Sequence, residues 1–569
     1  MKDKIKYLLV VFSMLLGMGI PLKATGSVTG LKVENTFVFD DKMDMADIQA
    51  VVDSIYPELT YPEHHFSIKR YALLFKPGVY HLDVRVGYYT HVMGLGKTPE
   101  EVTIVGAVRS NCDEGGHVLC NFWRAVENLT IIPTADDKTN TWAVSQAAPL
   151  RRVHIKGNLK LFEGASSGGF MANCKVDGIV FSGSQQQWFT RNSEIGSWNG
   201  GVWNMVYVGV KNAPKEDWPN TPVTIVDTTP LVKEKPYWIY SDNKYSLVCP
   251  QMRKETSGIN GMSGTERTIP LKDFYLVSPG TSAAQINQEI QKGRHILFLP
   301  GIHHIESPIV ADRKDMVLMG IGMASLVPTR GTAAIEVSDL PGITVAGLMI
   351  DASIPKSDHL MKVGEGKSNH QTADNPVCLY DMFFRVGGAH EGKAESCMIV
   401  NSDNVLIDHI WLWRADHGNG VAWNQNTCAN GLVVNGNRVT AYALFNEHFQ
   451  EYQTIWNGED GRVYMYQSEM PYDPPTPEGW KHGETYGYAS YKVADHVKRH
   501  HAWGVGIYNV FFDAPIVVDQ AIETPKHLEK SFYHKVIFWL NGHEKSFVKS
   551  VINGKGKGVN KKHRKSTMP

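Results

Sequence analysis

The sequence predicts an all-β protein built as two tandem right-handed parallel β-helices that pack side by side as solenoids. Two observations carry this prediction. A segment of the first half recurs in the second half, and short strand-like runs recur within each half at the step of one solenoid coil. The length of 569 residues is too large for one ordinary core and suits two such solenoids.

The internal repeat is clearest where residues 72–81 are laid over residues 295–304. Both segments are apolar strands that end at a Pro-Gly turn, and a short amphipathic segment precedes each of them. The offset from Pro77 to Pro300 is 223 residues, which is too long for one coil and fits a whole domain. One structural unit is therefore present twice.

The coil step appears in β-rich runs that begin at Leu129, Val153 and Val176, which are 24 and then 23 residues apart. In the second half, runs that begin at Arg438 and Arg462 are again 24 residues apart. Strands at this step stack into ladders, whereas the blades of a propeller repeat at about 40 to 50 residues. The step therefore favours a parallel β-helix.

These observations divide the chain, with the boundary in a polar stretch rich in Gly, Ser and Thr. We expect a signal peptide at residues 1–24, a first β-helix at 25–253, a linker at 254–270, a second β-helix at 271–552 and a basic disordered tail at 553–569. The signal is indicated by three lysines before an apolar run at the N-terminus that is too short to span a bilayer. An exported protein, periplasmic or secreted, follows from it.

The composition excludes some classes of partner. Lys and Arg number 57 against 58 Asp and Glu, so no net field attracts nucleic acid or an anionic membrane. The 14 Trp and 23 Tyr suit surfaces that stack on sugar rings. We expect a polysaccharide or oligosaccharide partner, no nucleic acid, no membrane span, no cofactor and a monomeric chain.

Two glutamates are the leading candidates for chemistry. Glu447 and Glu469 are 22 residues apart, close to one coil, so their carboxyls are expected to stack on one face. Two neighbouring carboxyls do not both ionise readily, so one is held protonated and can serve as a general acid toward a glycosidic oxygen. Their surroundings form a polar and aromatic strip that we expect to bind substrate: His448, Tyr452, Gln453, Trp456, Gln467 and Tyr472.

The sequence resembles the family 55 glycoside hydrolases, exo-acting β-1,3-glucanases with two tandem, pectin-lyase-like β-helices. The resemblance rests on five blocks in the same order, at residues 142–146, 166–171, 186–192, 447–453 and 467–472. The resemblance implies an enzyme that inverts the anomeric centre, which requires room for a water molecule beside the sugar.

The resemblance also implies roles for particular residues. Glu469 matches the general acid of the family and Glu447 its supporting carboxylate. Gln146 and Ser167 match the polar pair that positions the attacking water, and Gln187 belongs with them in the substrate site.

Other readings remain open from the residues alone. A polysaccharide lyase would need a basic residue at the sugar C5, usually with a calcium site or an Arg or Lys cluster. A non-catalytic glycan-binding solenoid would use the same aromatics without chemistry. His64 and His65 fit no standard metal-ligand spacing, so we expect no metal site.

Overall fold

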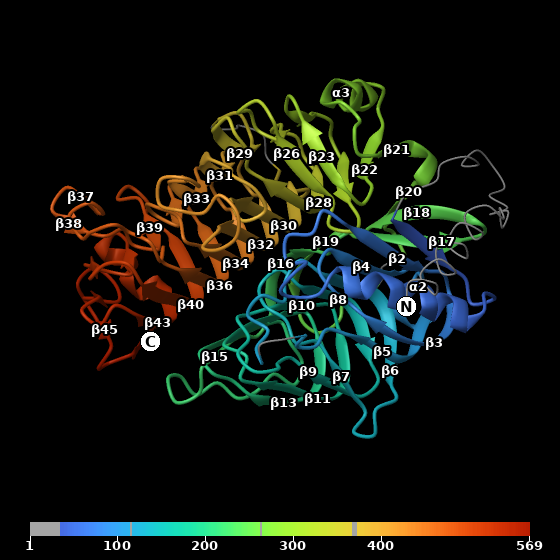
Figure 1. The fold of residues 1–569 in the computed structure, drawn as a ribbon, viewed down its shortest axis with the longest axis horizontal. Helices are drawn as coiled ribbons and strands as arrows, with labels where there is room; N and C mark the ends of the chain where they lie inside the picture. Colours follow the sequence, from blue (N-terminus) through green and yellow to red (C-terminus); the bar gives the residue numbers. More distant parts are fainter. Residues whose placement is uncertain (1–34, 114–115, 262–263, 367–371) are drawn as a thin grey trace, which may run out of the picture.

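The computed structural model describes residues 35–569 except 114–115, 262–263 and 367–371, and the expected signal peptide lies outside the described residues. The chain forms two parallel β-helices that lie side by side (Figure 1). None of the helices within the described ranges is long and apolar enough to cross a membrane.

The first β-helix is a 15-stranded sheet. Its main ladder runs in the order β1 (Thr36–Phe39), β2 (Tyr71–Phe75), β4 (Thr90–Gly94), β6 (Ala125–Pro133), β8 (Pro149–Ile155), β10 (Phe170–Ala172), β12 (Gln187–Arg191), β14 (Asn204–Val208) and β15 (Val223–Val226). The other strands are β3 (Gly78–Arg85), β5 (Val102–Arg109), β7 (Thr139–Thr141), β9 (Asn158–Lys160), β11 (Lys175–Gly183) and β13 (Glu194–Gly200). Each coil stacks on the one before it.

The second β-helix has two ladders. The 13-stranded sheet runs β21 (Phe274–Val277), β22 (His295–Phe298), β25 (Val317–Gly320), β28 (Thr344–Asp351), β30 (Cys378–Val386), β32 (Leu406–Arg414), β34 (Thr440–Glu447), β36 (Gly461–Glu469), β40 (His500–Phe511), β43 (Phe532–Gly542) and β46 (Lys565–Met568), with β23 (Ile302–Ile305) and β26 (Ser325–Pro328) beside it. The 8-stranded sheet runs β24 (Ile309–Ala311), β27 (Ile335–Val337), β29 (Ser357–Val363), β31 (Ala394–Val400), β33 (Asn430–Val434), β35 (Thr454–Trp456), β39 (Tyr491–Val493) and β42 (Ile522–Glu523).

The internal repeat appears as the same opening unit in both β-helices. A short helix precedes the first repeated strand, α2 (Met45–Ile55) in one half and α3 (Ala283–Gln291) in the other. Asp44 and Ser282 cap these helices by accepting a backbone N–H, which satisfies one of the unpaired donors at each helix start.

The predicted coil step holds with local corrections. Leu129 pairs with Val153, as the step of 24 residues requires. Val176 pairs with Ile155, however, and Arg462 pairs with Thr440. These two registers differ by two residues from the sequence alignment, because the connections that complete successive coils differ in length.

Turns of the second β-helix are stacked by an asparagine ladder. The amide of Asn457 donates to the side-chain oxygen of Asn435 at 2.8 Å, and Asn435 donates to Asn401 at the same distance. A Cβ on Gly458 would lie 1.8 Å from the carbonyl oxygen of Gly436, so the close stacking of these turns requires glycine.

Residues 254–270 are partly strand rather than a plain linker. The connection between the β-helices comprises β16 (Thr229–Lys233), paired with β19 (Met252–Thr256), and a sheet of β17 (Tyr237–Ser241), β18 (Lys244–Cys249) and β20 (Arg267–Pro270). The expectation of a disordered tail at 553–569 is wrong, since β46 pairs antiparallel with β43 and extends the sheet.

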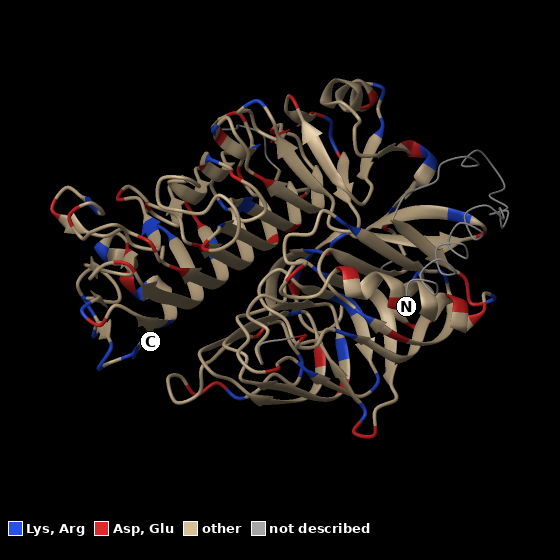
Figure 2. Cartoon of the chain, viewed as in Figure 1, with Lys and Arg blue, Asp and Glu red and all other residues tan. Residues whose placement is uncertain are grey.

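Buried ion pairs fix one β-helix against the other. Arg151 on β8 donates to Asp381 and Asp408 of the second β-helix at 2.8 Å each. Arg191 on β12 also donates to Asp408, at 2.9 Å from Nη2. Figure 2 shows both signs of charge spread along the chain. The interface therefore has a defined register, and that register sets where residues of the two halves meet.

Candidate active site

The two predicted carboxyls end neighbouring strands. Glu447 is the last residue of β34 and Glu469 the last residue of β36. Phe445 pairs with Gln467, so the step of 22 residues holds two positions before the glutamates. The backbone N–H of His448 then donates to the carbonyl of Glu469 at 2.8 Å. The predicted stacking of the two glutamates on adjacent coils is confirmed.

Glu447 lies in a buried pocket of hydrogen-bond donors, with only 2% of its surface exposed. The indole N–H of Trp411 donates to Oε2 at 2.8 Å, and the Gln146 amide donates to Oε1 at 3.0 Å. Burial and the charge of Glu469 raise the pKa of Glu447 well above its usual range, and these outweigh the donors that lower it.

Glu469 is also buried, with 8% of its surface exposed, and it accepts a hydrogen bond from the Tyr472 hydroxyl. Burial raises its pKa, while His448 and the Tyr472 hydroxyl act to lower it. The charge of Asp416 adds to the rise. A buried carboxyl with a raised pKa retains its proton toward neutral pH, which is the state that a general acid needs.

Residues of the first β-helix complete the site. Gln146 Nε2 lies 3.2 Å from Ser167 Oγ, and Gln187 Nε2 donates to the same oxygen at 3.2 Å. Gln146 has a φ of 24°, in the left-handed region that non-glycine residues rarely adopt. The side-chain oxygens of Gln146 and Gln187 are buried and have no partner among the residues that the structure describes. Such atoms in a native protein usually face a water or a ligand.

Three residues of the predicted strip lie near the carboxyl pair, and three do not. Gln467 lowers the pKa of Glu447 through its nearby amide, although no hydrogen bond of good geometry links it to a described residue. His448 and Tyr472 pack edge to face with ring centroids 4.4 Å apart.

The remaining three residues of the strip leave this face. Trp456 is on β35, in the other sheet, and is fully buried in the core. Gln453 bonds the backbone of Phe449, and the Tyr452 hydroxyl bonds His482 and Glu523. None of these contacts involves the carboxyl pair.

Sequence reasoning missed Trp411 as a direct partner of Glu447. Trp411 lies on β32 in a cluster of rings, 4.7 Å from Phe122 and 5.4 Å from Trp413 between centroids. The signal was available, because Trp413 pairs with Glu447 in the ladder. The cluster forms an aromatic wall at the point where the two halves meet.

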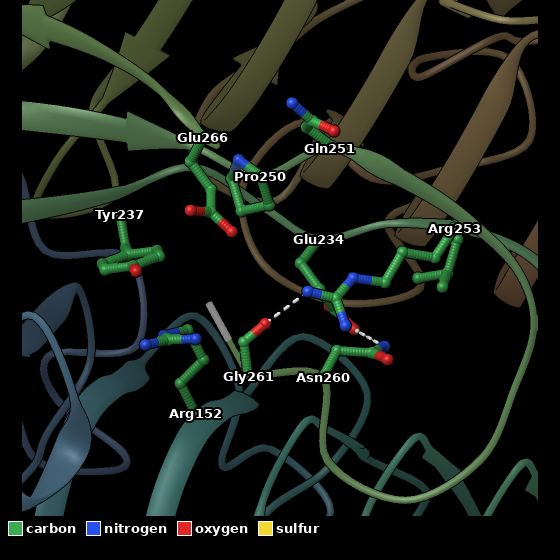
Figure 3. A pocket seen from close by; sticks show the side chains of 10 residues that line it. Arg152, Glu234, Tyr237, Pro250, Gln251, Arg253, Asn260, Gly261 and Glu266 are labelled. Carbon is green, nitrogen blue, oxygen red and sulfur yellow. Dashed lines mark hydrogen bonds between the residues drawn. The ribbon is translucent and has the colours of Figure 1, made fainter. Parts of the chain in front are cut away.

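A separate pocket lies beside the connecting strands (Figure 3). Asn260 donates to Glu234 at 2.9 Å, and Arg253 donates to the Gly261 carbonyl. Its volume is about 10 Å³, close to that of one water molecule. This pocket is too small for a sugar, so the carboxyl pair remains the candidate active site.

Comparison with known proteins agrees with this site. A family model described as the LAM55 pectate lyase-like domain matches residues 274–469, which include both glutamates. The exo-beta-1,3-glucanase of Streptomyces sp. (strain SirexAA-E / ActE) is 41% identical over 532 residues, covering 92% of this chain and 86% of that protein. The structure of sacteLam55A from Streptomyces sp. SirexAA-E has a TM-score of 0.89 at 40% identity and covers 94% of this chain and 97% of that one. A variant of it in complex with glucose has a TM-score of 0.90 at 39% identity, covering 95% and 98%. This chain therefore belongs to the family 55 glycoside hydrolases and is a glycoside hydrolase.

Proposed function

We propose that this enzyme hydrolyses β-1,3-glucan from the chain end, with inversion at the anomeric carbon. The observation that carries the proposal is the buried Glu447–Glu469 pair of the second β-helix, faced by the Gln146–Ser167 pair of the first. The name of the Streptomyces relative, an exo-beta-1,3-glucanase, supports the choice of substrate and of exo action.

Glu469 serves as the general acid in this proposal. Two interacting carboxyls titrate as a unit, and their repulsion favours one proton on the pair near neutral pH. Glu447 accepts two N–H groups, from Trp411 and Gln146, and N–H donors favour the ionised form of the carboxyl that accepts them. The shared proton therefore resides on Glu469 in the reactive state. It passes to the glycosidic oxygen as that bond breaks.

Gln146, Ser167 and Glu447 position and deprotonate the attacking water. Ser167 Oγ receives N–H groups from Gln146 and Gln187, so its own O–H remains to donate to the water oxygen. The unpartnered side-chain oxygens of the two glutamines accept the hydrogens of the water. The ionised Glu447 takes up the proton through Gln146, which lies 3.0 Å away.

The test is a polysaccharide panel with stereochemical readout. Purified protein is incubated with laminarin, with a mixed-linkage β-1,3/1,4-glucan and with a β-1,4-glucan, and the products are followed over time. We expect glucose from laminarin at early times, formed first as the α-anomer by NMR. Release of long oligosaccharides first would exclude exo action, and an initial β-anomer would exclude inversion.

We also propose that the enzyme acts outside the cytoplasm and as a monomer. The lysine-rich start and the apolar run at residues 7–20 support export. A single chain supplies both halves of the site, which supports the monomer. N-terminal sequencing of the product from the native host and light scattering of the purified protein test these two points.

A further inference from the structure

Three side chains with metal-binding atoms converge beside the aromatic wall. His65 and Cys120 come from the first β-helix, and His417 follows β32 of the second. One ligand atom from each lies within 4.8 Å of the other two. The ring nitrogens His65 Nδ1 and His417 Nε2 are 3.4 Å apart. Ligand atoms around tetrahedral zinc are about 3.5 Å apart, given bonds of about 2.0 Å to nitrogen and 2.3 Å to sulfur. Small side-chain movements therefore suffice to close the set on one ion.

The two histidines are held in place by their neighbours. The His65 ring is buried and stacks on Phe66 at 4.3 Å and on Tyr88 at 5.1 Å between centroids. His417 Nδ1 lies 3.0 Å from Asp416 Oδ1, which directs Nε2 toward His65. A carboxylate on the far nitrogen of a ligating histidine is the usual support of a metal site. The His417 side chain is 40% exposed, so an ion has a path from solvent.

The chemistry of the donors selects the metal. One thiol and two imidazoles suit zinc, whereas calcium and magnesium prefer carboxylate and carbonyl oxygens. We propose that His65, Cys120 and His417 form a zinc site, with the fourth position left to water, that joins the first β-helix to the second. This departs from the expectation of no metal, which considered His64 and His65 along the chain without His417.

The experiment uses the full-length protein, freed of metal with a chelator under reducing conditions. Titration with Zn²⁺ is followed by calorimetry, and titration with Co²⁺ by visible absorption. We expect one equivalent to bind, a thiolate-to-cobalt charge-transfer band, and a melting temperature that rises with zinc because the ion binds only the folded chain. Cys120→Ser should abolish the band and weaken zinc binding at least tenfold. Cys112→Ser, a matched control at the other half-buried cysteine of this region, should retain both.

A second variant separates a metal site from loss of structure. Asp416→Asn should weaken zinc binding about 10- to 100-fold while the charge-transfer band survives at saturation, because Asp416 orients His417 and does not bind the ion. Circular dichroism of each metal-free variant verifies folding. The proposal is overturned if no stoichiometric binding occurs, if Cys120→Ser binds zinc as the wild type does, or if Cys112→Ser loses the band equally.

Discussion

Gln146 and Glu447 are 301 positions apart in the sequence, and the amide of one donates to the carboxyl of the other at 3.0 Å. The contact crosses from the first β-helix to the second. The water-positioning side chains of the proposed mechanism and the proposed acid therefore come from different halves of the chain. Each half expressed alone should have no hydrolytic activity on laminarin, and measurable turnover by the second half alone would contradict the proposed use of Gln146.

Glu469→Gln should lower turnover of laminarin by about 10²- to 10⁴-fold, the usual contribution of a positioned general acid. The amide keeps the size of the side chain but has no proton to transfer. The measurement is kcat on laminarin and on an aryl glucoside whose phenolate leaves without protonation. The aryl substrate should be affected less, and wild-type kcat on laminarin would show that the acid lies elsewhere.

Glu447→Gln should lower turnover and shift the alkaline limb of the pH profile toward acid. The charge of a neighbouring carboxylate raises a pKa, so removing it lets Glu469 lose its proton at lower pH. The profile of kcat/KM against pH reports this change in the free enzyme. A limb that moves toward alkali would contradict the coupling of the two carboxyls.

Tyr472→Phe should move the same limb in the opposite direction. The Tyr472 hydroxyl lowers the pKa of Glu469 by donating to its carboxylate form. Without that donor the pKa of Glu469 rises and the acid form persists to higher pH. Comparison with Glu447→Gln in the same buffers provides the internal control, because the two variants should bracket the wild type.

Local spacing predicted only part of this site. Glu447 and Glu469 were found from the sequence because the coil step places residues 22 apart on neighbouring strands. Trp456 was misplaced because a strip that is continuous in sequence turns a corner in space. His448 has a φ of 69°, and the chain then enters β35 in the other sheet.

Contacts between the halves lie beyond any reasoning from spacing. His65 and His417 are 352 positions apart, and their contact depends on how the two β-helices pack. Gln146 was assigned to the site by family resemblance alone, since no periodicity links it to Glu447. The internal repeat predicts two β-helices but carries no information on the faces that they present to each other.

The packing of those faces depends on Asp408, which is 1% exposed and accepts from both Arg151 and Arg191. Asp408→Ala leaves two buried guanidinium groups without one of their counter-charges. Removing one partner of a buried ion pair typically costs about 3–5 kcal/mol, because the remaining charge stays in a poorly solvated environment. We expect a loss of that size in the free energy of unfolding, measured from the denaturant midpoint with an unchanged slope. The matched control is Lys356→Ala, which removes the exposed ion pair with Glu395 and should cost less than about 1 kcal/mol. Equal effects of the two variants would mean that Asp408 does not hold the two β-helices together.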